Sequence, residues 1–320
     1  MISIKIDLQF ILIERKLRMA YKPRKKSKKL IILGILNNRM TLLEKDSQHY
    51  YSLKKGYEGE VVFDSLTEKL SCNCYILNDL LLKVNNTTFQ IDTLIITEKI
   101  NIFEVKNYID DYYLDGDRLY KVPKTEYTNP LVQLTRCESL LRQLLHNLGL
   151  NLPIEAKVVF INPEFTLYQA PLDKPIIHPT QVNRFINHFD TENAYTELTE
   201  LHNKLAEKLV SLHSEEDPYS NLPIYKYKHL KKGFTCKICD SFSISVRGNR
   251  CVCEDCKYEE SVESTVIRTV TEVKLLFPEW KITTSGVLEW CTAIKCKRRI
   301  SRILGKHFKM EGKRKGIYYK

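Results

Sequence analysis

FQIDTLIITEKINIFEVKNY, residues 89–108, is the stretch that decides the fold of the first half of the chain. Two apolar runs, Ile91–Ile96 and Ile100–Val105, flank a polar break at residues 97–99. Short runs rich in Ile, Val and Phe are typical of buried β-strands. The sequence therefore predicts a β-hairpin with its turn at the polar break.

One acidic residue interrupts each apolar run. If the turn is centred on Glu98, facing residues have numbers that sum to 196, so Asp92 lies opposite Glu104. Directly opposed Cβ atoms are roughly 5 Å apart and like charges repel there, so a buried hairpin needs a cation to keep such a pair. Lys106 follows on the same face. A two-residue turn would instead place Asp92 opposite Val105. These side chains predict metal-dependent phosphodiester chemistry.

Four motifs in this order resemble the nuclease-related domain (NERD) over about residues 55–165: GYEGE at 56–60, FQID at 89–92, FEVKNY at 103–108 and NPLVQL at 129–134. An Ile precedes Asp92 where nucleases usually have Pro, and this is usual in NERD domains. The NERD family is similar to PD-(D/E)xK nucleases. The resemblance implies an α/β fold, with a mixed sheet flanked by helices and a metal-dependent nuclease site.

The roles expected at this site follow from the chemistry. Asp92 and Glu104 would hold Mg²⁺ or Mn²⁺, which polarises a phosphate and lowers the pKa of bound water. Lys106 would orient that water or offset charge on the phosphate. Glu60 could add a carboxylate, although a charge favoured by the helix dipole is the alternative. Gln133 matches the helix motif and could position the water or the backbone.

The same site region contains further polar positions. Gln90 precedes Asp92 by two residues and shares its face. Gly56 and Gly59 are expected to shape a turn into a helix. From Gly59 onward, Val61, Val62, Leu66 and Leu70 recur at helical intervals, which predicts an amphipathic helix with Glu60 in its first turn.

The remaining α/β elements follow from apolar patterns and turn residues. Before residue 55 we expect a disordered basic arm at 22–29 and helical spacing over 30–51. The other expected elements are a strand or strand pair at 74–84 followed by a turn at Asn85-Asn86, and a hairpin at 112–122 turning at 115–117. They continue with a helix opened by Asn129-Pro130 and ended by Gly149, a strand at 156–161 and a helical segment at 180–212. This order is typical of an α/β sandwich.

A cysteine pattern marks a separate segment. Cys236-x-x-Cys239 and Cys253-x-x-Cys256 are 13 residues apart. Two such pairs supply four thiolates for tetrahedral zinc, so we expect a small zinc ribbon with a structural metal. Cys251 could compete with Cys253 as a ligand, and free cysteines are the alternative.

The last sixty residues predict three helices, near 263–276, 284–292 and 296–308. Ile300, Ile303, Leu304 and Phe308 form an apolar stripe on the third. A basic third helix after a short turn is typical of a helix-turn-helix recognition helix, and residues 312–319 could form a small wing. The expected nucleic-acid-binding residues are Lys297, Arg298, Arg299, Arg302 and Lys306. A generic solvated basic helix is the alternative.

Charge is concentrated at the two ends of the chain. Of the net charge of +11, residues 291–320 carry +10 and residues 1–29 carry +8, which leaves about −7 for residues 30–290. Lys and Arg bind phosphates non-specifically, so we expect nucleic-acid affinity to come mainly from the two ends of the chain. Solubilising basic tails are the alternative.

Composition bounds the remaining properties. At 320 residues, with 28% charged and 43% hydrophobic residues, the chain is typical of soluble globular proteins of two or three domains. Ten cysteines indicate a reducing compartment, and no apolar run is long enough for a spanning helix. Asp7 and Glu14 break any signal-peptide core, and Met19 could be the start. We expect a cytoplasmic protein without membrane contact.

The sequence predicts five segments along the chain. They are 1–54 (basic arm and helix), 55–165 (NERD domain), 166–229 (helical extension and linker), 230–260 (zinc ribbon) and 261–320 (basic helix-turn-helix segment).

The function we expect is a metal-dependent nuclease acting on DNA, in DNA processing, repair or defence. An inactive nucleic-acid-binding or regulatory protein with the nuclease fold is the first alternative. A protein-interaction module in a repair or defence pathway is the second. An intact set of Asp92, Glu104 and Lys106 favours the nuclease.

Overall fold

A computed structural model describes residues 20–215, 222–312 and 316–320. The expectations about a signal peptide and about Met19 as the start concern residues outside these ranges, as do part of the linker and part of the wing. The described chain forms two compact units. Among the described residues, the first unit contains 20–26 and 52–215, and the second contains 27–51, 222–312 and 316–320. The finer division into five segments stays a prediction.

The first unit is built on a five-stranded mixed sheet with the strand order β1-β2-β3-β7-β9. β1, β2 and β3 pair antiparallel, whereas β7 pairs parallel with β3, and β9 parallel with β7. The strands are β1 (Tyr75–Val84), β2 (Thr87–Ile96), β3 (Ile100–Lys106), β7 (Ile154–Phe160) and β9 (Ile176–Ile177). The mixed sheet expected from the sequence is confirmed.

The central hairpin has the register expected from a turn centred on Glu98. Thr93 pairs with Phe103 and Ile96 with Ile100, so the residue numbers in each pair sum to 196. The paired ladder ends at Thr93–Phe103, one position before Asp92 and Glu104. β3 continues to Lys106 beside β7. The two strands therefore separate where the acidic residues begin.

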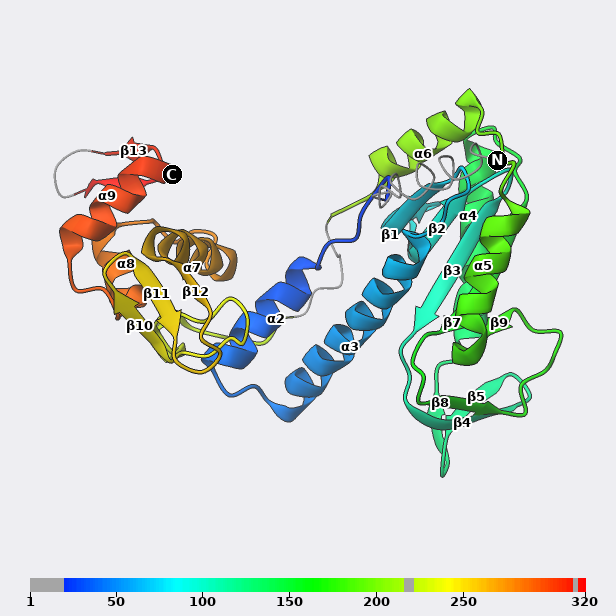
Figure 1. Ribbon diagram of the computed structural model, residues 1–320, viewed down its shortest axis with the longest axis horizontal. Coiled ribbons are helices and arrows are strands. Elements are labelled where there is room, and N and C mark those ends of the chain that lie inside the picture. The colour runs from blue at the N-terminus through cyan, green and yellow to red at the C-terminus, as the bar shows by residue number, and fades with distance from the viewer. Residues whose placement is uncertain (1–19, 216–221, 313–315) are drawn as a thin grey trace, which may run out of the picture. The chain divides into compact units, whose positions relative to one another are not determined.

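Helices cover both faces of this sheet (Figure 1). Leu141 of α4 (Pro130–Asn147) and Ala206 of α6 (Glu200–Leu212) belong to one apolar core. Phe63 of α3 (Glu44–Thr67) and Phe189 of α5 (Val182–Glu192) belong to a second core, with Phe103 of β3. Apolar residues on both faces explain why the strands read as nearly continuous apolar runs. The α/β sandwich is confirmed.

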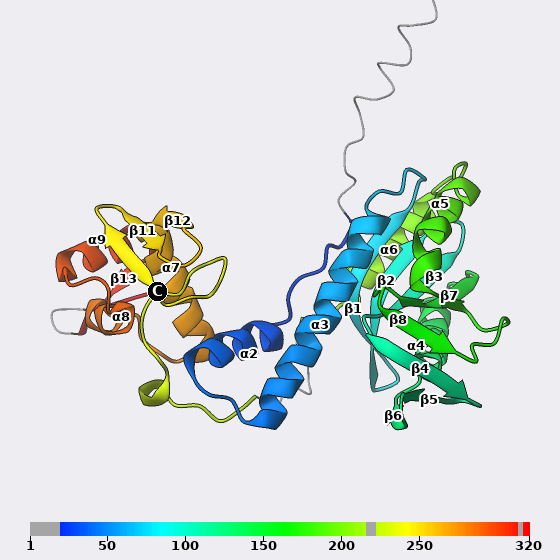
Figure 2. The same ribbon diagram turned by 60° about the horizontal axis from the view of Figure 1, so that its bottom comes forward.

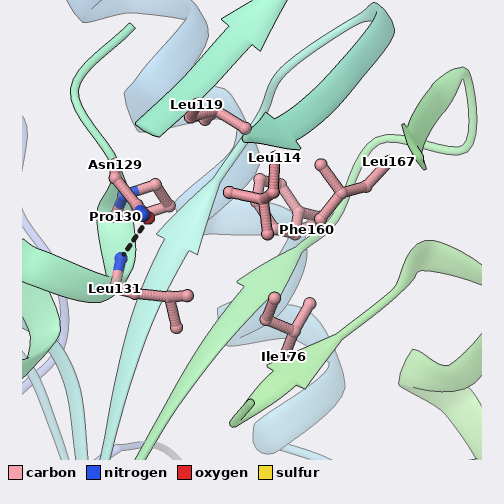
Figure 3. Close-up of a pocket in the computed structure, with 8 residues that line it drawn as sticks. All are labelled: Leu114, Leu119, Asn129, Pro130, Leu131, Phe160, Leu167 and Ile176. Carbon is pink, nitrogen blue, oxygen red and sulfur yellow. Dashed lines mark hydrogen bonds between the residues drawn. The ribbon is translucent and has the colours of Figure 1, made fainter. Parts of the chain in front are cut away.

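A second sheet lies beyond the C-terminal ends of β3 and β7 (Figure 2). Its strand order is β6-β5-β4-β8, with the expected turn at Gly116, where φ is +58°. The strands are β4 (Asp110–Asp115), β5 (Arg118–Lys121), β6 (Thr125–Tyr127) and β8 (Phe165–Tyr168). A small apolar hollow separates its hairpin from β7 and α4 (Figure 3). There Asn129 caps α4 by accepting a hydrogen bond from the Leu131 N–H at 3.0 Å, as its sequence predicts.

Several expectations about the segments before residue 70 are wrong. Residues 22–29 are not a disordered arm, because Lys22 forms a parallel bridge with Leu77 and α2 (Lys28–Arg39) begins within the segment. Residues 30–51 span two helices, and α3 begins at Glu44 and continues through both glycines. The apolar face of α3 also differs from the expected one. Val61 and Val62 are exposed, whereas Gly59, Phe63 and Thr67 are buried at four-residue intervals.

The helical segment expected at 180–212 is interrupted. η1 (Pro179–Gln181) leads into α5, and residues 193–199 separate α5 from α6. The break allows the two helices to cover opposite faces of the sheet.

The second unit combines α2 with the C-terminal third of the chain. Its elements are η2 (Tyr227–His229), β10 (Ile244–Arg247), β11 (Arg250–Cys253), β12 (Glu259–Ser261), α7 (Val262–Leu276), α8 (Thr284–Cys291), α9 (Lys297–His307), β13 (Met310–Glu311) and β14 (Tyr318–Tyr319). The three C-terminal helices lie where the sequence predicts them. Ile32 and Leu36 of α2 pack with Val273 of α7 and Trp290 of α8.

Within the ranges that the structure describes, no helix is both long enough and apolar enough to span a bilayer.

Candidate active site and metal centre

The site lies where β2 and β3 separate. Asp92 is 7% exposed, and its Oδ2 accepts a hydrogen bond from the backbone N–H of Val105 at 2.8 Å. The carboxylate therefore satisfies a β3 amide that the β2 backbone no longer reaches. This bond fixes Asp92 beside β3, between the two residues predicted to share its site, Glu104 and Lys106.

Glu104 and Lys106 form a buried ion pair on β3. Lys106 Nζ lies 2.6 Å from Glu104 Oε1, and the Glu104 side chain is 3% exposed. Lys106 Nζ also donates to Gln133 Oε1 on α4 at 3.1 Å. Gln133 therefore contacts the lysine, and its expected positioning of water or backbone stays a prediction. The spacing of two residues along a strand places Glu104 and Lys106 on the same face.

A third carboxylate reaches the site from α3. Glu60 Oε2 accepts from Arg24 Nη1 at 2.7 Å. The other guanidinium nitrogens of Arg24 bond to Asp64, one helical turn after Glu60, and to the backbone oxygen of Asp92 at 2.7 Å. Glu60 is in the middle of α3, not in a first turn, so the helix-dipole explanation for this residue is wrong.

β1 contributes a fourth acidic group next to Asp92. The register of β1 and β2 pairs Asn78 with Thr93 and Leu80 with Ile91, and it is interrupted between them, where Asp79 faces Asp92. Asp79 has a φ of +56°, which accounts for the interruption. Its carboxylate accepts from Gln90 Nε2 at 2.8 Å. The side chain of Gln90 thus contacts Asp79.

Close approach of α3 to the end of β3 depends on a glycine. A Cβ on Gly59 would lie 2.5 Å from Cβ of Asn107. Asn107 donates to the backbone oxygen of Lys55 at 2.7 Å and accepts from Asn162 at 2.9 Å. The Asn of the FEVKNY motif therefore joins α3 to the segment after β7. Gly59 allows the helix that carries Glu60 to reach the sheet.

Burial and mutual repulsion change the acidity of these groups. Burial and the charge of Asp92 raise the pKa of Glu104 to about 7. Burial and the same charge raise the pKa of Glu60 to about 8, although Arg24 opposes the shift. Burial also raises the pKa of Asp92. Burial lowers the pKa of Lys106, but Glu104 and Asp92 outweigh it, so the net shift is upward. A cluster of carboxyls with raised pKa values beside a charged lysine is typical of a functional site.

The donor set at the site fits a hard divalent cation. Asp92 uses Oδ2 and Glu104 uses Oε1 in the contacts above, and among the described residues no hydrogen bond engages the second oxygen of either carboxylate. Carboxylate oxygens are the ligands that Mg²⁺ and Mn²⁺ prefer. The site can therefore supply one oxygen from each strand to a metal ion.

About one third of the chain matches a known protein family. Residues 55–161 match the family model described as nuclease-related domain, NERD. This segment is a nuclease-related domain. No curated protein and no solved structure gave a match. The nuclease-related domain contains Asp92, Glu104, Lys106, Glu60 and Gln133, whereas Arg24 lies outside the matched residues.

The second unit contains the cysteine cluster. The Sγ atoms of Cys236, Cys239, Cys253 and Cys256 all lie within 4.8 Å of one another, with Cys236–Cys256 at 3.5 Å and Cys239–Cys253 at 3.6 Å. Four thiolates on a tetrahedral zinc at about 2.3 Å would be about 3.8 Å apart. The cluster is compatible with a zinc ribbon, together with the three-stranded sheet β10-β11-β12. Cys251 is not in the cluster; it is buried among apolar residues beside Val266.

The five basic residues predicted on α9 have different environments. Arg299 donates to the backbone oxygen of Gly248 and to Asn249 Oδ1, at 2.8 and 3.0 Å. Lys306 pairs with Glu263 at 2.6 Å. Lys297, Arg298 and Arg302 are exposed and have no partner among the described residues. Arg299 and Lys306 thus attach α9 to its own unit, and the other three are available to a ligand.

Sequence reasoning missed several residues of the site. Arg24 was grouped with a basic arm, and Asp64 and Asp79 were not singled out. Asp64 has one recoverable signal, since it follows Glu60 by four residues on one helix. Nothing in the local sequence indicates that Arg24 reaches β2, because that contact spans 68 residues.

Proposed function

We propose that the protein is a metal-dependent nuclease that hydrolyses phosphodiester bonds in DNA. The observation that carries the proposal is the convergence of Asp92, Glu104 and Lys106 inside a nuclease-related domain. Burying two carboxylates beside each other costs free energy, so their presence in a sheet supports a chemical role.

In this proposal, Asp92 and Glu104 hold Mg²⁺ or Mn²⁺. When bound, the metal would polarise the scissile phosphate and lower the pKa of a coordinated water. Lys106 carries a positive charge at the same face, where it orients the attacking water or offsets negative charge on the phosphate. Gln133 orients Lys106 through the 3.1 Å hydrogen bond. Glu60 brings a third carboxyl group to the site from α3, where it pairs with Arg24.

The metal at the cysteine cluster has a structural role in this proposal, not a catalytic one. We propose that Cys236, Cys239, Cys253 and Cys256 bind one Zn²⁺, and that this metal is structural, because four thiolates leave no coordination position for substrate. Its effect would be to fix β10–β12, against which Arg299 of α9 is held.

We also propose that the second unit holds DNA through α9. The order α7, α8, α9, β13, β14 is that of a helix-turn-helix followed by a wing. Exposed Lys297, Arg298 and Arg302 supply charge for phosphates. If these three contact phosphates, log affinity should fall against log salt with a slope of about −3 from this helix.

Salt-dependent binding tests the α9 proposal. Arg298→Ala combined with Arg302→Ala should weaken duplex binding and make the salt slope shallower by about 2. The control is Lys306→Ala, which removes a cation paired with Glu263 and should leave the slope nearly unchanged. Equal slopes for the double variant and the wild type would show that α9 is a generic solvated basic helix.

Cleavage assays test the nuclease proposal. Purified protein would be incubated with labelled linear duplex, circular duplex and single-stranded DNA, in Mg²⁺, Mn²⁺ or EDTA. We expect cleavage that depends on the metal, and the three substrates separate attack on ends from attack on internal bonds. If DNA is bound but never cut, the protein is a nucleic-acid-binding or regulatory protein that retains the nuclease fold. If DNA is neither bound nor cut, an interaction module is favoured.

A further inference from the structure

Arg24 is almost fully buried against the candidate site, with a side chain that is 3% exposed. It comes from the segment before α2, outside the residues that match the nuclease-related family. A buried guanidinium needs several acceptors to offset its desolvation. Arg24 has such acceptors in two carboxylates of α3, a backbone oxygen of β2 and a threonine hydroxyl.

All three nitrogen atoms of the Arg24 guanidinium group donate hydrogen bonds. Nε and Nη2 reach the two oxygens of Asp64 at 2.8 and 3.1 Å, which is bidentate pairing. Nη1 reaches Glu60 at 2.7 Å, and Nη2 also reaches the backbone oxygen of Asp92 at 2.7 Å and Thr93 Oγ1 at 3.3 Å. One cation thus joins α3 to the position on β2 that carries Asp92.

The segment that delivers Arg24 is itself fixed to the sheet. The backbone of Lys22 donates to the oxygen of Ile76 at 3.1 Å and accepts from the N–H of Asn78 at 2.9 Å. Lys22 Nζ bonds to the backbone oxygens of Asn78 and Asp79, both at 2.7 Å. Lys22 therefore forms a bridge with the edge of β1, and Arg24 enters the site two residues after this fixed point.

The charges at the site indicate what Arg24 replaces. The site region holds five carboxyl groups, those of Glu60, Asp64, Asp79, Asp92 and Glu104, and Arg24 pairs directly with the first two. Carboxylate oxygens are ligands of Mg²⁺ and Mn²⁺, and the two ions of a two-metal site in nucleases are about 4 Å apart. Here the guanidinium lies between Glu60 and Asp64 and contacts β2, so it already neutralises the carboxylates of the α3 side. Asp92 and Glu104 remain for a metal.

We propose that Arg24 is a positioning residue whose guanidinium takes the place of a second cation, so that the site binds one divalent metal ion instead of two. The inference rests on the proposed metal-dependent function. It adds that a residue outside the matched family segment sets the metal count and holds Glu60 and the Asp92 backbone in place.

Counting bound Mn²⁺ tests the proposal without measuring cleavage. Mn²⁺ binding to the full chain, loaded with Zn²⁺, would be measured by electron paramagnetic resonance and calorimetry. Mn²⁺ prefers oxygen ligands, so it should not compete for the four thiolates. We expect one Mn²⁺ in the wild type, and two, with coupled spins, in Arg24→Met. Arg24→Lys keeps a cation and should still bind one.

Two further variants serve as a control and as a replacement for Arg24→Met. Lys25→Met is the matched control, because Lys25 is the next residue and its pair with Glu215 is exposed; it should bind one Mn²⁺. Arg24→Gln removes the charge but can still donate a hydrogen bond to Asp64. It therefore replaces Arg24→Met if that variant folds poorly. We expect Arg24→Gln to bind two Mn²⁺ ions.

The outcomes distinguish this inference from the proposed function. Two Mn²⁺ in the wild type would overturn the inference and leave the nuclease proposal standing. One Mn²⁺ in the wild type and in both charge-removing variants would show that Arg24 is only a structural brace, which also overturns it. Absence of Mn²⁺ binding in the wild type would overturn the metal-dependent function and the inference together.

Discussion

The side chain of Asp92 takes over a backbone hydrogen bond of the sheet, because its Oδ2 accepts from the N–H of Val105 at 2.8 Å. Paired residues of β2 and β3 end at Thr93 and Phe103. Beyond that point the two strands are joined by this carboxylate. Asp92 therefore has a structural role and, in the proposed mechanism, a metal-binding role. Substitutions of Asp92 can separate these two roles.

Asp92→Asn and Asp92→Ala should affect activity alike and stability differently. Both remove the charged ligand, so both should abolish metal-dependent cleavage. The Asn oxygen can still accept from Val105, whereas Ala leaves that buried N–H unsatisfied, at a cost of about 1–3 kcal/mol. Urea unfolding without metal should therefore give a lower free energy of unfolding for the Ala variant than for the Asn variant. Equal stability would show that the Val105 bond does not contribute.

The two glycines of α3 should respond in opposite directions to alanine. A Cβ at Gly59 would meet Asn107 at 2.5 Å, so Gly59→Ala should destabilise the fold by about 1–3 kcal/mol. A Cβ at Gly56 meets nothing within 4 Å, so Gly56→Ala should stabilise the helix by about 0.5–1 kcal/mol. Thermal unfolding of both variants checks this. A stabilised Gly59→Ala protein would mean that α3 does not need its close approach to β3.

Metal affinity should rise with pH because a proton competes for Glu104. Its pKa, raised to about 7, leaves the carboxyl mostly protonated at pH 6 and mostly ionised at pH 8. A metal ion needs the ionised form, so the Kd for Mn²⁺ should fall by about tenfold over this range from this group alone. Calorimetry at several pH values measures it, with Glu104→Gln as the control. An affinity that is flat or falls with pH would contradict the assignment.

The cysteine cluster gives a matched pair of substitutions on one strand. Cys253→Ala removes a member of the four-thiolate cluster and should lower the zinc content well below one atom per chain, destabilising the ribbon. Cys251→Ala, two residues away on β11, lies outside the cluster and should keep about one zinc per chain. Elemental analysis of protein purified without added metal decides this. A metal-free but folded second unit in the wild type would overturn the zinc proposal.

Local patterns predicted the strands well and the site only in part. The apolar runs around Thr97-Glu98-Lys99 and the alternation that places Glu104 and Lys106 on one face are local properties, so the hairpin and its register followed from the sequence. The helix that carries Glu60 was mispredicted because Gly56 and Gly59 look like turn residues. Both lie inside a long helix, and at Gly59 the tertiary contact with Asn107 favours a residue without a side chain.

The remaining parts of the site depend on contacts between distant segments. Arg24 has the local sequence of a solvated basic arm, and only the pairing of Lys22 with β1 brings it to Asp64 and Glu60. Asp79 reaches Asp92 through an interruption in β1 that needs a positive φ at a non-glycine residue. No periodicity indicates either feature.

The most direct test of the account compares two identical substitutions in the same hairpin. Glu104→Gln removes the buried carboxylate of the site, and Glu98→Gln removes the exposed one in the turn. The rate of Mg²⁺-dependent cleavage of labelled DNA would be measured for both variants and the wild type. We predict that Glu104→Gln loses at least about 100-fold in rate and that Glu98→Gln cuts at the wild-type rate. Cleavage by Glu104→Gln at the wild-type rate would contradict the assigned site.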